Sequence, residues 1–276
     1  GPIAGDTHIN LGNGRIFNSF AGSCNADIQG HTETIIGVNN GFPYVRDHLY
    51  GGNDLGGAIL GKVDFKNNVR TSTNDGYDAI GKVSNSDMLK ASAYIEYNQG
   101  RVVNIYGGCY GVYDYTNSLY RAYFNEDGIA RSGYSKPFLS NAFINFRPNN
   151  STNPLTSVKQ IYGAGQGYLG EKEENKMQES SYILIDIPQS MQAFQSMEVF
   201  GAGECGGVGM YVDLTGDNPD YDKASAIIDL ARGQINAVYG GSYQEGITRR
   251  TVVNVPEGST IKLNNIFGGA YGVQND

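Results

Sequence analysis

The chain lacks several features that would point to common classes of protein. It contains no tryptophan, only 17% of its 276 residues are charged, and no run of eighteen apolar residues occurs. A membrane-spanning helix needs about 20 predominantly apolar residues, so none is expected. Lysine and arginine total 20 against 28 acidic residues, which gives a net charge of −8, and they form no basic stripe. Because neutralisation of phosphates dominates nucleic-acid binding, we expect no nucleic-acid partner.

Cysteine is also scarce. The three cysteines, Cys24, Cys109 and Cys205, form an odd set that excludes complete intramolecular pairing. Each lies within a few residues after the glycine pair of a glycine-rich phrase, and the phrases that contain a cysteine alternate with cysteine-free ones. If the phrases stack as neighbouring strands at about 4.8 Å, the cysteines lie roughly 10 Å apart, too far for a disulfide. We therefore expect small buried side chains in turns.

Glycine and tyrosine are abundant, at 39 and 20 residues, and much of the glycine belongs to a repeated phrase. The phrase is an aliphatic residue, an aromatic residue, then Gly followed by Gly or Ala. Its six copies are "LYGGNDLGG" at 49–57, "IYGGCYG" at 105–111, "IYGAGQG" at 161–167, "VFGAGECGG" at 199–207, "VYGGSYQEG" at 238–246 and "IFGGAYG" at 266–272. A degenerate copy, "SFAGSC", occupies 19–24. Such repetition favours an architectural role over a phosphate-binding loop.

Two residue types define the repeat. The aromatic positions are Tyr50, Tyr106, Tyr162, Phe200, Tyr239 and Phe267, and the first glycines are Gly51, Gly107, Gly163, Gly201, Gly240 and Gly268. Glycine permits both positive φ angles and close backbone approach, and the sequence leaves both uses open. We expect the aliphatic residue before each aromatic to point inward, while the face of the aromatic ladder stays undecided.

Each phrase is preceded by two short segments rich in Ile, Val, Tyr and Phe and separated by turn residues, as in "SAYIEYNQGRVVNIYGG". This pattern indicates strand, tight turn, strand, glycine corner and loop. The loop after the glycines varies most in length. Because repeat proteins commonly place binding surfaces where insertions gather, this edge is the predicted functional region. The fold predicted for residues 1–276 is a single all-β domain, a right-handed parallel β-helix solenoid.

The repeated phrase resembles the glycine-rich repeats of secreted bacterial surface proteins that have the parallel β-helix fold. The resemblance implies an adhesin-like protein that is secreted or attached to the cell surface. The final residues, "FGGAYGVQND", stop just after a glycine pair, where a further repeat could begin. We therefore expect a fragment of a longer secreted chain, with further repeats of that chain among its partners. The β-helix fold is shared by polysaccharide lyases and hydrolases, so a carbohydrate-active enzyme remains an alternative. A structural spacer within a larger fibre is the other.

The loop at 110–128 carries the composition that glycan or protein recognition requires, flat aromatic faces beside charged groups. Its candidate binding residues are Tyr110, Tyr113, Asp114, Tyr115, Tyr120, Arg121, Tyr123 and Glu126. We expect non-enzymatic recognition of a glycan or a protein surface through such loops. No catalytic residues are assigned, because Asp47 and His48 in "RDHLYGG" are adjacent and so point to opposite faces of a regular strand.

One acidic loop, "DLTGDNPDYD" at 213–222, is a candidate calcium site. Calcium prefers several carboxylate and carbonyl oxygens, which Asp213, Asp217, Asp220 and Asp222 would supply. The spacing lacks the full EF-hand series, and a solvated turn is the simpler interpretation. Calcium is therefore the only cofactor considered from the sequence.

Overall fold

A computed structural model of the chain describes residues 1–65, 90–111, 138–149, 153–167, 178–209, 226–244 and 246–272. These residues form seventeen β-strands and one short 3₁₀ turn, η1 (Val38–Asn40), and include no α-helix. Among them, no helix is long and apolar enough to cross a membrane. The protein is therefore all-β, as the sequence predicts.

Most of the strands belong to one 15-stranded sheet with two arms. The first arm contains β1 (Thr7–Leu11), β4 (Thr32–Ile36), β9 (Ala93–Tyr97), β11 (Phe138–Phe146), β13 (Gln178–Asp186) and β16 (Thr251–Asn254). The second arm contains β2 (Gly14–Ile16), β3 (Ser19–Phe20), β5 (Pro43–Tyr50), β10 (Arg101–Tyr106), β12 (Ser157–Tyr162), β14 (Glu198–Phe200) and β17 (Thr260–Phe267). The long strand β15 (Ala226–Tyr239) belongs to both, because its first half pairs with β13 and its second half with β14.

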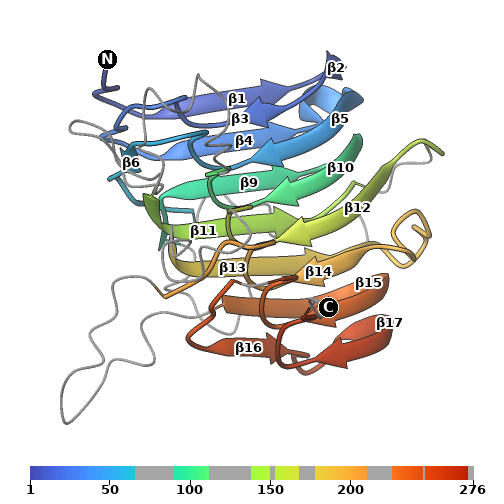
Figure 1. Cartoon of the computed structure of the whole chain (residues 1–276). Coiled ribbons are helices and arrows are strands. Elements are labelled where there is room, and N and C mark those ends of the chain that lie inside the picture. Colours follow the sequence, from blue (N-terminus) through green and yellow to red (C-terminus); the bar gives the residue numbers. More distant parts are fainter. Residues whose placement is uncertain are drawn as a thin grey trace, which may run out of the picture.

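The chain alternates between the two arms, and every strand pair within the sheet is parallel. Each first-arm strand from β4 onward is followed by a second-arm strand, and the next pair adds on the same side (Figure 1). The figure shows this progression from the N-terminal strands in blue to the C-terminal strands in red. Successive units of the sequence therefore lie side by side in order.

The main core lies between the two arms and is mostly aliphatic, with the rings of Tyr97, Phe146 and Phe194 at one end of the cluster's strands. In the first arm, Ile95, Ile144, Ile183 and Ile228 pair in register and are fully buried. The residue before each repeated aromatic enters the same cluster from the second arm, namely Leu49, Ile105, Ile161, Val199 and Val238. The predicted inward orientation of these residues is confirmed. Ile266 in the sixth copy is 48% exposed, because β17 pairs only with β15 among the described strands.

A third, shorter row of parallel contacts lies just before the first-arm strands along the chain and includes the beginnings of β11 and β13. It runs through Ile3, Ile28, Ile59, Leu139, Gln178, Val208 and Thr248 and includes β6 (Ala58–Ile59). Ile28 and Ile59 are buried in a small cluster of their own. A separate antiparallel pair joins β7 (Val63–Asp64) to β8 (Lys90–Ala91).

The first glycine of each repeat is required by close approach of neighbouring chains. A Cβ atom built on Gly51, Gly107, Gly163, Gly201 or Gly240 would lie 2.1–2.4 Å from the carbonyl oxygen of the first glycine in the next copy. None of these glycines has a φ angle in the left-handed region. At the first glycine of each phrase, the structure therefore shows that glycine serves close backbone approach and not a positive φ angle.

A later glycine of the phrase has the other use. Gly111, Gly167 and Gly272 each come four residues after the first glycine of their copies and have φ angles of 60°, 72° and 73°. An L-amino acid with a side chain rarely adopts this conformation. One short phrase therefore uses glycine for contact at its start and for a turn at its end.

Near the turn that follows the first arm, three charged side chains are buried together. Asp186 at the end of β13 is fully buried and contacts Arg147, at an Nε–Oδ2 distance of 2.8 Å, and Arg232 of β15. Register pairing of Asp186 with Arg232 holds this group between adjacent strands. Because desolvation of charges is costly, removal of one member from such a group is strongly destabilising.

Substitution of a first glycine should lower the free energy of unfolding only where the next repeat packs against that glycine. We expect Gly163→Ala to lower the free energy of unfolding by about 2 kcal/mol or more, because its Cβ would lie 2.1 Å from the Gly201 carbonyl oxygen. Gly268→Ala is the matched control, since no atom lies within 4 Å of its added Cβ. Urea unfolding followed by circular dichroism measures both. Equal destabilisation by the two variants would contradict the close-approach explanation.

Loss of the buried carboxylate should destabilise the protein more than loss of a surface one. We expect Asp186→Ala to cost about 3–5 kcal/mol, because two buried guanidinium groups lose their counter-ion. Glu179→Ala is the control: its partner Lys62 is 49% exposed and the N–O distance is 3.6 Å, so the change should be within about 1 kcal/mol. Chemical denaturation of the two variants gives the comparison. Similar losses would refute the role assigned to Asp186.

Candidate functional site

The repeated aromatics form a continuous ladder on the outer side of the second arm. Neighbouring rings from Phe20 through Phe267 are stacked, with centroids 4.6–5.0 Å apart and interplanar angles of 15° or less. Phe20 comes from the degenerate copy at 19–24. Each offset pair adds about 1 kcal/mol beyond the effect of area burial. The ladder predicted from the repeats exists, and it faces away from the aliphatic core.

Side chains of the loops after the glycines cover this ladder. Tyr110 lies edge-on to Phe20 and Tyr50, at centroid distances of 6.1 and 5.3 Å. Tyr243 lies edge-on to Phe200 at 5.3 Å. The rings of the four central rungs, from Tyr50 to Phe200, are at most 2% exposed. The central part of the ladder is therefore closed to a ligand.

The tyrosine hydroxyl groups of the ladder bind to loop side chains. Tyr50 donates to Gln166 Oε1, and Tyr106 donates to Glu204 Oε2 at 2.6 Å. Burial raises the pKa of both tyrosines well above the ordinary value, and nearby Glu204 raises it further. These groups stay protonated at all physiological pH values. Their hydrogen bonds fix the loops and supply no acid–base chemistry.

Most of the predicted loop sites lie outside the described residues. These are Tyr113, Asp114, Tyr115, Tyr120, Arg121, Tyr123 and Glu126 of the candidate binding loop, and Asp213, Asp217, Asp220 and Asp222 of the candidate calcium loop. Tyr110 alone is described, and it packs on the ladder. Recognition through these loops and calcium binding remain predictions.

The prediction that Asp47 and His48 point to opposite faces of a strand is wrong. The two side chains contact each other, with His48 Nε2 3.3 Å from Asp47 Oδ1. Val45 pairs with Val102 but His48 pairs with Asn104, so β5 contains one residue more than β10 over this stretch. Such a bulge breaks the strict alternation of faces on which the expectation rested. His48 lies edge-on to Tyr50 and Tyr106 and belongs to the covering of the ladder.

An open hollow lies at the other end of the second-arm strands. It has a volume of about 360 Å³ and is lined by Gly14, Arg15, Phe42, Tyr44, Arg101 and Leu155. Register brings Arg15, Tyr44 and Arg101 side by side on β2, β5 and β10. We call these six residues the arginine–tyrosine pocket.

The pocket combines an aromatic ring with two cations. The guanidinium carbon of Arg101 lies 4.9 Å from the centroid of the Tyr44 ring, within the range of a cation–π interaction. Arg15 and Arg101 are exposed, and neither forms a salt bridge within the described part of the chain. Their donors remain available to an anion. Leu155, 58% exposed, adds an apolar rim.

Short loops hold the pocket in shape. The backbone N–H of Phe42 donates to Asn13 Oδ1 at 2.9 Å, which connects the loop before β5 to the loop before β2. The backbone N–H of Leu155 donates to Asn153 Oδ1 at 3.0 Å. Gly14, with a φ of 105°, begins β2 in a conformation that other residues avoid. The pocket is thus built on hydrogen-bonded turns and paired strands.

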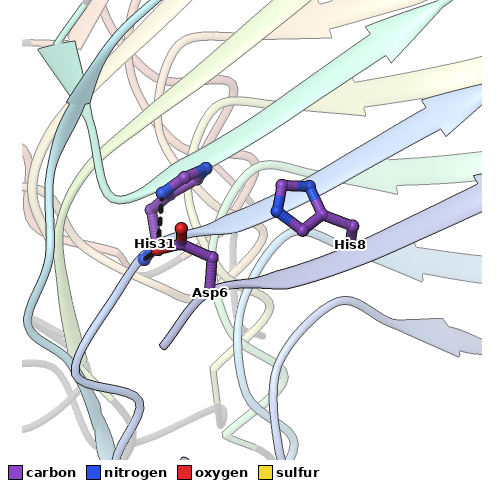
Figure 2. A group of neighbouring side chains, drawn as sticks. All are labelled: Asp6, His8 and His31. Carbon is purple, nitrogen blue, oxygen red and sulfur yellow. Dashed lines mark hydrogen bonds and ion pairs between the residues drawn. The ribbon is translucent and has the colours of Figure 1, made fainter. Parts of the chain in front are cut away.

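Sequence reasoning missed two groups of residues. The pocket residues come from four successive units of the chain, and their meeting depends on a register that cannot be read from the sequence. The second group is Asp6, His8 and His31, which lie together at the first two strands of the first arm (Figure 2). The sequence does contain a pattern for this group. In "DTH" at 6–8 and "HTE" at 31–33, side chains that can bind a metal occupy alternate positions and therefore share one face of each strand.

Comparison of the chain with protein-family models, curated proteins and solved structures found no match.

The cysteines should differ in reactivity in the folded protein. All three are free; Cys24 is exposed, whereas Cys109 and Cys205 are buried. Burial raises the pKa of the Cys109 thiol to about 12, so about one molecule in 10⁴ is a thiolate at pH 8. We expect Cys24 to react in the native state with Ellman's reagent, more slowly than a fully exposed thiol because partial burial and Asp54 raise its pKa, and all three thiols to react in guanidinium chloride. Cys24→Ser should remove the native reaction, and rapid native labelling of Cys109 would contradict the assignment.

Proposed function

We propose that this chain is a parallel β-helix binding protein, with no catalytic function, that recognises an anionic glycan at the arginine–tyrosine pocket. The β-helix interpretation is supported by alternation of the chain between two parallel arms and by the third row of parallel contacts. Side-by-side addition of successive repeats gives it further support. The glycine-rich repeats, which resemble those of secreted or surface-attached proteins, support a location outside the cell.

One observation carries the proposal. On a chain with net charge −8, Arg15 and Arg101 occupy the strands on either side of Tyr44, without acidic partners among the described residues. An aromatic ring offers an apolar face to the C–H groups of a sugar. A guanidinium binds carboxylate or sulfate through two parallel hydrogen bonds. A uronic acid, sialic acid or sulfated sugar carries both features.

The composition of the pocket favours binding over catalysis. Glycoside hydrolysis requires two carboxylates about 5–10 Å apart, and none of the six lining residues is acidic. Histidine, serine and cysteine are also missing from this lining. The carbohydrate-active enzyme is therefore the weaker alternative at this site.

Replacement of pocket residues should weaken binding of an acidic glycan. We expect Tyr44→Ala and Arg101→Gln each to raise the Kd for a charged oligosaccharide about tenfold, which corresponds to about 1.4 kcal/mol. Isothermal titration against sialyl-, uronate- and sulfate-containing oligosaccharides selected on a glycan array measures this. Affinity should fall as salt rises, and neutral analogues should bind weakly.

Arg46→Gln is the matched control, because Arg46 is an exposed arginine of β5 outside the pocket. It removes the same charge and should leave the Kd nearly unchanged. Binding of no acidic glycan on the array, or an equal loss in Arg46→Gln, would refute the proposal. The array is read with calcium and with chelator, so that a calcium-dependent contribution of the 213–222 loop is separated.

A further inference from the structure

Three side chains with metal-ligating atoms meet on the first arm, away from the arginine–tyrosine pocket. Asp6 precedes β1, His8 lies in β1 and His31 precedes β4. One ligand atom from each lies within 4.8 Å of the other two. Figure 2 shows the Asp6 carboxylate against the His31 ring, with the His8 ring beside them. We propose that these residues bind one divalent transition-metal ion, of which Zn²⁺ fits the donors best.

Strand register explains why they meet. β1 and β4 are parallel, and Thr7 pairs with Thr32 while His8 pairs with Glu33. Because side chains alternate between faces, the residues on either side of each threonine share the opposite face. Asp6 and His8 on one strand therefore lie beside His31 and Glu33 on the next. The two histidines occupy one diagonal of this square and the two carboxylates the other.

Contacts within the square resemble those around metal-binding histidines. His31 Nδ1 lies 2.9 Å from Asp6 Oδ1, and His8 Nδ1 lies 2.9 Å from Glu33 Oε2. The rings are 5.6 Å apart and nearly perpendicular. At His8, the Glu33 carboxylate on Nδ1 fixes the tautomer that leaves Nε2 free to bind a metal. At His31, the metal ion would take the place of the proton between Nδ1 and the Asp6 carboxylate, so that Nδ1 and a carboxylate oxygen of Asp6 become ligands. Glu33 thus orients His8, whose Nε2 is the proposed ligand atom.

Asp6 and His31 are held in place before an ion arrives. Asp6 Oδ1 also accepts the backbone N–H of His31 at 2.9 Å, which leaves Oδ2 available. A Cβ on Gly30 would lie 2.0 Å from Asp6 Oδ1, so a residue larger than glycine would displace this carboxylate. The His31 side chain is 11% exposed and lies edge-on to Phe65, a buried ring stacked on Tyr94.

The remaining adjustment is small. Zinc bonds to nitrogen and oxygen of about 2.0–2.2 Å in a tetrahedron place ligand atoms roughly 3.4 Å apart. Since the ligand atoms lie within 4.8 Å of one another, the widest separation must close by at most about 1.4 Å. His8, with a side chain 51% exposed, can make this movement. Water would complete the coordination on the exposed side.

The donors and the charges select the class of ion. Two imidazoles with one carboxylate suit Zn²⁺ and its neighbours, whereas calcium requires six to eight oxygen ligands. Asp6 and Glu33 together balance the charge of a divalent cation. The backbone N–H of His31 lowers the pKa of Asp6, which keeps its carboxylate ionised. This site is distinct in chemistry from the candidate calcium loop at 213–222.

Titration of the untagged chain with ZnCl₂, CoCl₂ and CaCl₂ by calorimetry tests the proposal. We expect one Zn²⁺ or Co²⁺ per chain with a Kd on the order of 10 μM or below, and no competition from Ca²⁺. Bound Co²⁺ should give the intense visible absorption of a tetrahedral complex. His8→Ala and Asp6→Asn should each raise the Kd for Zn²⁺ more than about 100-fold, beyond the roughly 10–100-fold that loss of an outer-shell partner costs. Circular dichroism verifies that both variants fold.

The third histidine supplies the matched control. His48→Gln removes one imidazole on the second arm and should leave the Kd unchanged. Absence of Zn²⁺ binding tighter than about 1 mM would overturn the proposal, as would equal losses in His48→Gln and His8→Ala. Preferential binding of Ca²⁺ to the cluster would overturn the choice of ion. None of these outcomes depends on glycan binding.

Discussion

The contact of one glycine with the next sets the register of the second arm. A carbonyl oxygen occupies the space where a Cβ of the preceding repeat would be, from Gly51 to Gly240. Only hydrogen fits, so neighbouring strands come to hydrogen-bonding distance at the same residue of every repeat. This register places the aliphatic residue before each aromatic over its equivalent in the core, and it stacks the aromatic rings on the other face.

The two ends of the second-arm strands have different uses. At the glycine end, Tyr110 and Tyr243 cover the aromatic ladder, and Gln166 and Glu204 accept hydrogen bonds from the hydroxyl groups of Tyr50 and Tyr106. The variable loops therefore contribute to stability there, whatever else they do. At the opposite end, Tyr44 and its two neighbouring arginines remain uncovered among the described residues. A partly exposed aromatic ring between two arginines therefore remains where the covering stops.

Composition and repetition predicted much of this fold. The six phrases identified the strands, the inward aliphatic residues and the aromatic ladder, and the exposed Ile266 departs from the pattern only because β17 has one described neighbour. The candidate sites were harder to predict from the sequence. Arg15, Tyr44 and Arg101 occupy strands whose pairing cannot be counted from spacing, since repeat lengths vary. The bulge in β5 likewise has no clear sequence signal, so Asp47 and His48 were placed incorrectly.

Parallel pairing between distant segments has a consequence for folding. Thr7 pairs with Thr32, and Tyr44 pairs with Arg101, so almost every stabilising contact closes a long loop of chain. Loop closure costs entropy before the contact is formed, and proteins dominated by such contacts fold slowly. Once two neighbouring units have paired, each further unit adds to an existing edge. Formation of the first paired units should therefore limit the rate, and the rest of the chain should follow by growth from that nucleus.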